Sequence, residues 1–71
     1  MKDAVNVDME KVGNMRYEHL WTWSELARRS NVTTATIFAL KAGRRRASMR
    51  TLHKIAHALG VQPGTLIKKD A

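Results

Sequence analysis

The stretch SELARRSNVTTATIF, residues 24–38, decides the fold because it predicts two short helices that meet at a sharp corner. The corner contains neither Gly nor Pro, which are the usual residues at such a turn. Asn31 stands where the chain must change direction, and Asn is the non-glycine residue that best tolerates a left-handed backbone. We therefore expect two helices held at a fixed angle, with Asn31 in the left-handed conformation between them.

Residues that can cap helices set the boundaries of this pair. Thr22 has Glu25 three residues later, which is the spacing of a capping box and predicts that a helix starts directly after Thr22. Thr33 can cap the next helix, which we expect to cover residues 34–41 before Gly43 ends it. The residues expected to face inward are Leu26 with Trp23 or Ala27, then Val32, Ile37 and Leu40.

The sequences on either side predict the rest of an all-α chain. Residues 1–7 have no clear period, and we expect a flexible N-terminal segment there, followed by one domain over residues 8–71. Asp8 and Ser48 can each cap a helix, and Pro63 suits the start of a short last helix. We therefore predict a compact bundle of about five short helices. The apolar positions expected in the flanking helices are Val12, Met15 and His19 or Leu20, then Leu52, Ile55, Ala56 and Leu59, and finally Leu66 and Ile67.

Positive charge is concentrated in the second part of the chain. The net charge is +7, and between Leu26 and Lys69 there is no Asp or Glu, while Lys and Arg occur ten times. All six acidic residues lie outside that span. A surface with one sign of charge repels itself, which indicates a polyanionic partner such as nucleic acid rather than a merely solvated face.

The composition excludes several other classes of protein. Cysteine is absent, so neither a disulfide nor a thiolate metal site or nucleophile is available, and 71 residues leave room for one domain. No apolar run approaches the roughly 18 residues of a membrane span, and the N-terminus has no secretory signal, so we predict a cytoplasmic protein. A Gly-rich phosphate loop, an acid cluster and a Ser/His/Asp set are missing. We therefore expect neither an enzyme nor a cofactor or small-molecule ligand.

Two histidines stand at a spacing that metal ligands use on helices. His53 and His57 are four residues apart, but no third ligand is evident. Ordinary surface or half-buried histidines explain the pair better, and we expect no metal site.

Residues 23–42 resemble the helix-turn-helix of the lambda-repressor-like, Cro and XRE family. The matching positions are the core residues Leu26, Val32, Ile37 and Leu40, the small Ala27 where the two helices touch, and the turn residue Asn31. The likeness continues outside the motif, from about Val12 to Ile67, and includes Arg16 and Trp21.

Three positions depart from the pattern of that family. Ser30 stands where an apolar residue is common, and Asn31 replaces Gly. Lys41 replaces the Glu that pairs in many members with the Arg of the first helix. Since Lys41 and Arg16 are both cationic, that pair cannot form, and the partner of Arg16 stays open.

The resemblance implies sequence-specific binding of double-stranded DNA by a small Cro-like or repressor-like regulator, with helix 34–41 in the major groove. It implies that the helix starts face phosphates, that the outer face of helix 34–41 meets base edges, and that the basic loop follows the sugar-phosphate chain. The residues in these roles are Thr22, Trp23 and Thr33 for the helix starts, Thr34, Ala35, Phe38 and Ala39 for the bases, Lys41 or Arg44 at the edge of the groove, and Arg44, Arg45 and Arg46 for the loop.

Other interpretations stay open at this point. The same fold could serve as a protein-interaction module, such as an antitoxin, or in an RNA-binding or nuclease accessory role. Duplex RNA is disfavoured because its major groove is too narrow for side chains to read. Phe38 could instead pack on a neighbouring loop or lie in a protein interface. Arg28 and Arg29 could be solvent-exposed charges without a partner. Two copies could pair through Leu66 and Ile67 and bind a palindromic site as a homodimer.

Overall fold

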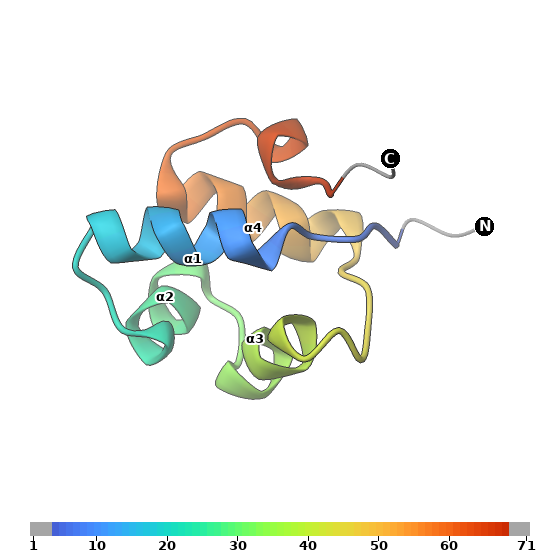
Figure 1. Cartoon of the computed structure of the whole chain (residues 1–71), viewed down its shortest axis with the longest axis horizontal. Coiled ribbons are helices and arrows are strands. Elements are labelled where there is room, and N and C mark those ends of the chain that lie inside the picture. Colours follow the sequence, from blue (N-terminus) through green and yellow to red (C-terminus); the bar gives the residue numbers. More distant parts are fainter. Residues whose placement is uncertain (1–3, 69–71) are drawn as a thin grey trace.

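The computed structural model describes residues 4–68, and it confirms the predicted all-α fold (Figure 1). Figure 1 shows α4 in the middle, with α2 and α3 on one side of it and the last short element, η1, on the other. Because η1 is a 3-10 helix, the last of the five predicted helices is not an α-helix. No helix in the described part of the chain has the length and hydrophobicity of a membrane span. The elements are α1 (Met9–Glu18), α2 (Trp23–Ser30), α3 (Thr34–Lys41), α4 (Met49–Leu59) and η1 (Pro63–Leu66).

One core joins all five elements. Its largest fully buried side chains come from α1, α2, α3, α4 and η1, so no helix packs on the others as a separate layer. Burial of each such side chain removes apolar surface from water and stabilises the fold by about 1.5 to 3 kcal/mol. These residues are Val12, Leu26, Ile37, Leu52, Ile55 and Leu66.

The corner between α2 and α3 has the predicted geometry. Asn31 adopts φ 60° and ψ 40°, which is the left-handed conformation. The N–H of Val32 donates to the carbonyl of Ala27 at 3.0 Å and closes the end of α2. Ser30, at the position where the family commonly has an apolar residue, is 3% exposed and donates its hydroxyl to the Leu26 carbonyl at 2.6 Å. These bonds and the buried contacts around them fix the angle between α2 and α3.

Four side chains cap the four α-helices as predicted. An oxygen of each side chain accepts a hydrogen bond from the backbone N–H three residues later, which satisfies one donor of the first turn. The capping residues are Asp8, Thr22, Thr33 and Ser48. At the end of α3, Gly43 adopts φ 74°, and the N–H of Arg44 donates to the carbonyl of Ala39 at 3.0 Å. The basic loop therefore leaves α3 at a defined point.

Residues 5–7 of the segment that we predict to be flexible pair with distant parts of the chain. Val5 and Ala47 exchange two backbone hydrogen bonds of 2.8 and 3.0 Å, and the N–H of Lys68 donates to the carbonyl of Asn6. Val7 is buried and forms a bridge with Ile67. The segment is thus fixed by partners far away in the sequence, which periodicity within the segment does not reveal. Residues 1–3 of the predicted segment lie outside the described residues.

Two predicted apolar positions have a different role from the one expected. Leu20 is 86% exposed at φ 61°, because α1 ends at Glu18 and the turn directs residues 19 and 20 away from the core. Leu66 is fully buried within its own chain. It cannot contribute to a pairing surface between two copies, so that part of the dimer prediction is wrong.

Candidate nucleic-acid interface

Most of the eleven residues that the resemblance assigns to DNA contact lie at the surface. A contact to DNA requires exposure, and only Trp23 and Ala39 of this set are half-buried. The residues come from three consecutive pieces of chain, namely the start of α2, the whole of α3 and the loop that follows it. The exposed members are Thr22, Thr33, Thr34, Ala35, Phe38, Lys41, Arg44, Arg45 and Arg46.

The starts of α2 and α3 carry the two threonine caps of this surface. The hydroxyl oxygen of Thr22 accepts from the N–H of Glu25 at 3.0 Å, and that of Thr33 accepts from the N–H of Thr36 at 3.1 Å. Both threonines are exposed. The other N–H groups of each first turn have no acceptor within the helix, and the helix dipole adds partial positive charge there.

Helix α3 separates its residues into a buried and an exposed face. Ile37 and Leu40 are buried in the core, where α3 packs on α2, and they fix the rotation of the helix about its axis. Thr34, Ala35 and Phe38 lie outside this buried stripe and are exposed, with Phe38 46% exposed. The exposed face of α3 therefore offers one hydroxyl, two methyl groups and one aromatic ring near its start and centre.

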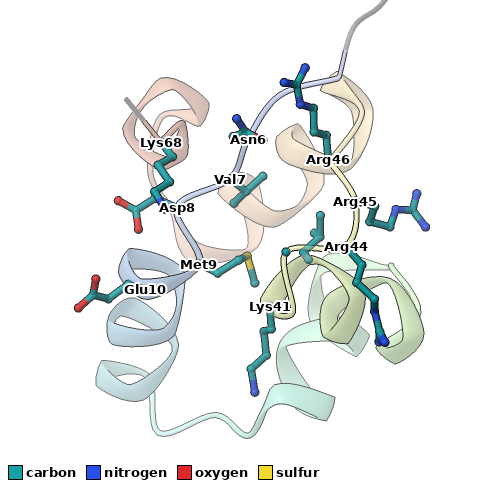
Figure 2. A pocket seen from close by; sticks show the side chains of 12 residues that line it. Asn6, Val7, Asp8, Met9, Glu10, Lys41, Arg44, Arg45, Arg46 and Lys68 are labelled. Carbon is teal, nitrogen blue, oxygen red and sulfur yellow. The ribbon is translucent and has the colours of Figure 1, made fainter. Parts of the chain in front are cut away.

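The basic loop borders a hollow of about 690 Å³ between α3 and the N-terminal segment. Figure 2 shows Lys41, Arg44 and Arg45 on one side of this hollow, and Asp8 and Glu10 on the opposite side. The two acidic residues therefore line the same hollow as the basic loop although they are remote from it in the sequence. Phosphates are favoured on the side of the basic loop and disfavoured beside the start of α1.

The ion pairs of the described residues are confined to α2. Glu25 accepts from Arg28 at 2.5 Å and from Arg29 at 2.6 Å. The hydrogen bond from Arg28, aided by the one from Arg29, lowers the pKa of Glu25 below its ordinary value of 4.5. Arg28 and Arg29 thus have a carboxylate partner, whereas no ion pair within residues 4–68 includes Lys41 or the arginines of the loop.

Arg16 has a different partner from the one that the family pattern provides. Its Nη1 donates to the backbone carbonyl of Trp21 at 2.5 Å. Its guanidinium also lies over the indole of Trp23, 4.5 Å from the ring centroid, and the Nζ of Lys41 lies 4.4 Å from the same centroid. A backbone carbonyl and an aromatic ring therefore replace the missing carboxylate.

The predicted histidine pair lies at the surface of α4. The rings of His53 and His57 are 6.2 Å apart and both residues are exposed. Within residues 4–68, no group of three His, Cys, Asp or Glu side chains is arranged to hold a metal ion.

The sequence of residues 11–70 matches the Cro/C1-type helix-turn-helix DNA-binding domain, which covers most of the chain. The chain belongs to this family. The match includes all four α-helices except the first two residues of α1. The lambda-repressor-like assignment from the sequence is thereby confirmed, and so is the DNA-binding class of the domain.

Several solved structures share the fold of this Cro/C1-type domain. The complex of the SinR protein with the SinI protein has a TM-score of 0.79 at 22% identity and is matched over 87% of this chain and 61% of that one. SinR bound to DNA has a TM-score of 0.73 at 23% identity, over 79% and 90% of the two chains. The clp gene regulator ClgR from C. glutamicum has a TM-score of 0.65 at 30% identity, over 76% and 70%. No curated protein sequence gave a match.

Sequence reasoning did not find two features of this Cro/C1-type surface. The first is the contact that Trp23 makes with cations from two other helices. The second is the position of Asp8 and Glu10 across the hollow from the basic loop. Both features depend on how distant segments pack. For the contacts of Trp23, the sequence contained one signal, because Arg16 lacks the carboxylate partner that the family pattern provides.

Proposed function

We propose that this domain is a sequence-specific regulator of transcription that binds double-stranded DNA with α3 in the major groove. The observation that carries the proposal is the division of α3 into two faces, with Ile37 and Leu40 anchored in the core and Thr34, Ala35 and Phe38 free at the surface. The major groove admits an α-helix and displays a distinct pattern for every base pair. An anchored helix with a free face can enter that groove in one defined orientation.

The helix starts and the basic loop would supply contacts to the backbone. Thr22 and Thr33 stand at helix starts, where free N–H groups favour an anion. Residues 44–46 supply three arginines beyond the end of α3, and none forms an ion pair within the described residues. Contacts of this kind fix the orientation of the protein on the duplex and carry no sequence information.

The chemistry of α3 suggests which bases it would prefer. Thr34, Ala35, Phe38 and Ala39 present methyl groups, one hydroxyl and a ring, and these groups fit the thymine methyl better than a hydrogen-bonding edge. We expect thymine at the contacted positions, a further contribution from DNA shape, and a basic side chain at the edge of the groove.

Selection of bound sites from a random pool of duplex DNA tests the function. One enriched sequence motif supports specific recognition, and a palindromic motif supports two domains bound as a homodimer. If no sequence is enriched while the protein is folded, sequence-specific regulation is refuted and a protein-interaction role of the antitoxin kind gains support.

Salt dependence tests the phosphate contacts separately. If two bound domains together neutralise about 6 to 10 phosphates, affinity should fall by roughly 10³ to 10⁵ between about 50 and 200 mM salt. Replacement of all three arginines at 44–46 by Ala should weaken binding to every sequence alike and flatten the slope. A control that removes the same charge elsewhere, Arg28→Ala with Arg29→Ala and Lys54→Ala, should change the slope less. Equal slopes for both triple variants would contradict the assignment of the loop.

A further inference from the structure

Cations from two other helices contact the indole of Trp23. The guanidinium carbon of Arg16 in α1 and the Nζ of Lys41 in α3 lie 4.5 and 4.4 Å from its centroid. The same Nζ lies 5.3 Å from the centroid of the Phe38 ring. A cation within about 6 Å of such a centroid is attracted by the negative face of the ring. The first residue of α2 thus joins α1 to the last residue of α3.

The side of this cluster that faces α1 is fixed. Arg16 is half-buried and held by the carbonyl of Trp21. Gly13 allows the indole to approach α1, since a Cβ at that position would lie 3.3 Å from Cη2 and Cζ2 of Trp23. The indole therefore has little freedom, and the mobile member of the cluster is the exposed Lys41.

Contact with two rings restricts a side chain that is otherwise flexible. A lysine has a flexible stem of four carbons, and ordering such a side chain costs about 0.5 to 1.5 kcal/mol when a complex forms. Here Trp23 and Phe38 hold the ammonium group before any partner arrives. The two cations on the indole also lie within roughly one Debye length, about 8 to 10 Å, so each repels the other. An acceptor from outside would relieve that repulsion.

The direction of the cluster follows from its place on α3. Phe38 and Lys41 are three residues apart and therefore neighbours on one helix face. Phe38 belongs to the exposed face that we assign to DNA, and Lys41 is the last residue of the helix. The remaining side chains of that face offer one hydroxyl and otherwise apolar groups. Lys41 is thus the strongest donor on α3 itself, and a lysine in the major groove commonly donates to O6 or N7 of guanine.

We propose that Trp23 and Phe38 are positioning residues that hold the ammonium group of Lys41 to read one guanine in the bound site. This inference rests on the proposed function. The inference adds one guanine of the bound site to the thymines that the other residues of α3 are expected to contact. The rings set the orientation of Lys41 and make no hydrogen bond to the base themselves.

The experiment compares affinity for the selected duplex with affinity for duplexes in which one G·C pair is replaced by A·T. Lys41→Met should remove discrimination at one guanine, by about fivefold or more, and leave the other positions unchanged. Trp23→Leu and Phe38→Leu should each weaken discrimination at that same guanine. Trp23→Phe should restore most of it because it retains a ring. Trp21→Leu is the matched control, and it should leave the preference for that guanine intact.

Three results would overturn the inference, and they differ from failure of the proposed function. If Lys41→Met weakens all duplexes equally, Lys41 contacts a phosphate. If Trp23→Leu lowers thermal stability but keeps the guanine preference, the indole has only a structural role.

NMR tests the cluster without DNA, since ring currents should shift the side-chain protons of Lys41 upfield and Trp23→Leu should abolish the shift. An unshifted Lys41 contradicts the cluster, whereas failure of the proposed function would appear as the absence of any selected site.

Discussion

Truncation of Ile37 to Ala tests whether α3 is oriented with this side chain in the core. Ile37 is fully buried in the core, and its truncation removes three buried carbon groups. Substitutions of this kind cost about 2 to 5 kcal/mol, because the lost burial adds to the cost of the cavity that remains. A domain of this size has a total stability of only about 4 to 11 kcal/mol. The variant should therefore be largely destabilised or unfolded.

Thermal unfolding followed by circular dichroism measures this effect. Each kcal/mol shifts the midpoint by about 4 to 8 °C in a domain of this size, so a loss of about 2 kcal/mol or more should lower it by at least about 8 °C. Met49→Ala is the control, because Met49 is 52% exposed and its truncation should change stability little. If Ile37→Ala melts together with the parent, Ile37 is not buried, and the assignment of Thr34, Ala35 and Phe38 to the outer face fails with it.

Three further predictions concern the corner, the ion pairs and the bases. Asn31→Gly should keep the stability of the parent, whereas Asn31→Ala should lose about 1 to 2 kcal/mol in urea unfolding because Ala is strained at φ 60°; equal losses would contradict the turn geometry. The lowered pKa of Glu25 means that its pairs stabilise the fold above pH 4.5 and that this contribution disappears as pH falls through the lowered value. In Glu25→Gln, thermal melts at several pH values should lack this part of the acid-induced loss of stability. If the variant has the same pH profile as the parent, the ion pairs of Glu25 do not stabilise the fold. Replacement of single thymines of the selected site by uracil should weaken binding at one or two positions, and Ala35→Gly should reduce that sensitivity; uniform tolerance of uracil would exclude methyl recognition.

The sequence predicted the helix boundaries well because the interactions that set them are local. A threonine or serine cap bonds to an N–H only three residues later, and the left-handed turn depends on Asn31 alone. The buried face of α3 follows from the spacing of Ile37 and Leu40. The same spacing indicates which residues of α3 are exposed.

Interactions between distant segments could not be predicted in this way. Val5 is fixed by Ala47, and no pattern within residues 1–7 encodes that pairing. The segment of η1 is too short to have a helical period, so its two apolar residues could not be divided between core and surface. Leu66 fills the core of its own chain, where pairing with a second copy was one expectation. Lys41 illustrates the same limit, because its separation from Trp23 in the sequence gives no indication that the two side chains meet.

Photochemical crosslinking provides the most direct test of the claim that α3 lies in the major groove. 5-Iodouracil, placed at the thymines of the selected site, carries its iodine where the thymine methyl projects into that groove. Trypsin cleaves after Arg29 and Lys41, so one peptide, residues 30–41, contains the whole of α3. Mass spectrometry should find the crosslinked nucleotide on this peptide, and Ile37→Ala, which removes the anchor of the helix, should abolish the product. Crosslinks found only on peptides from α1 or α4 would show that another surface meets the bases and would contradict the proposed mode of binding.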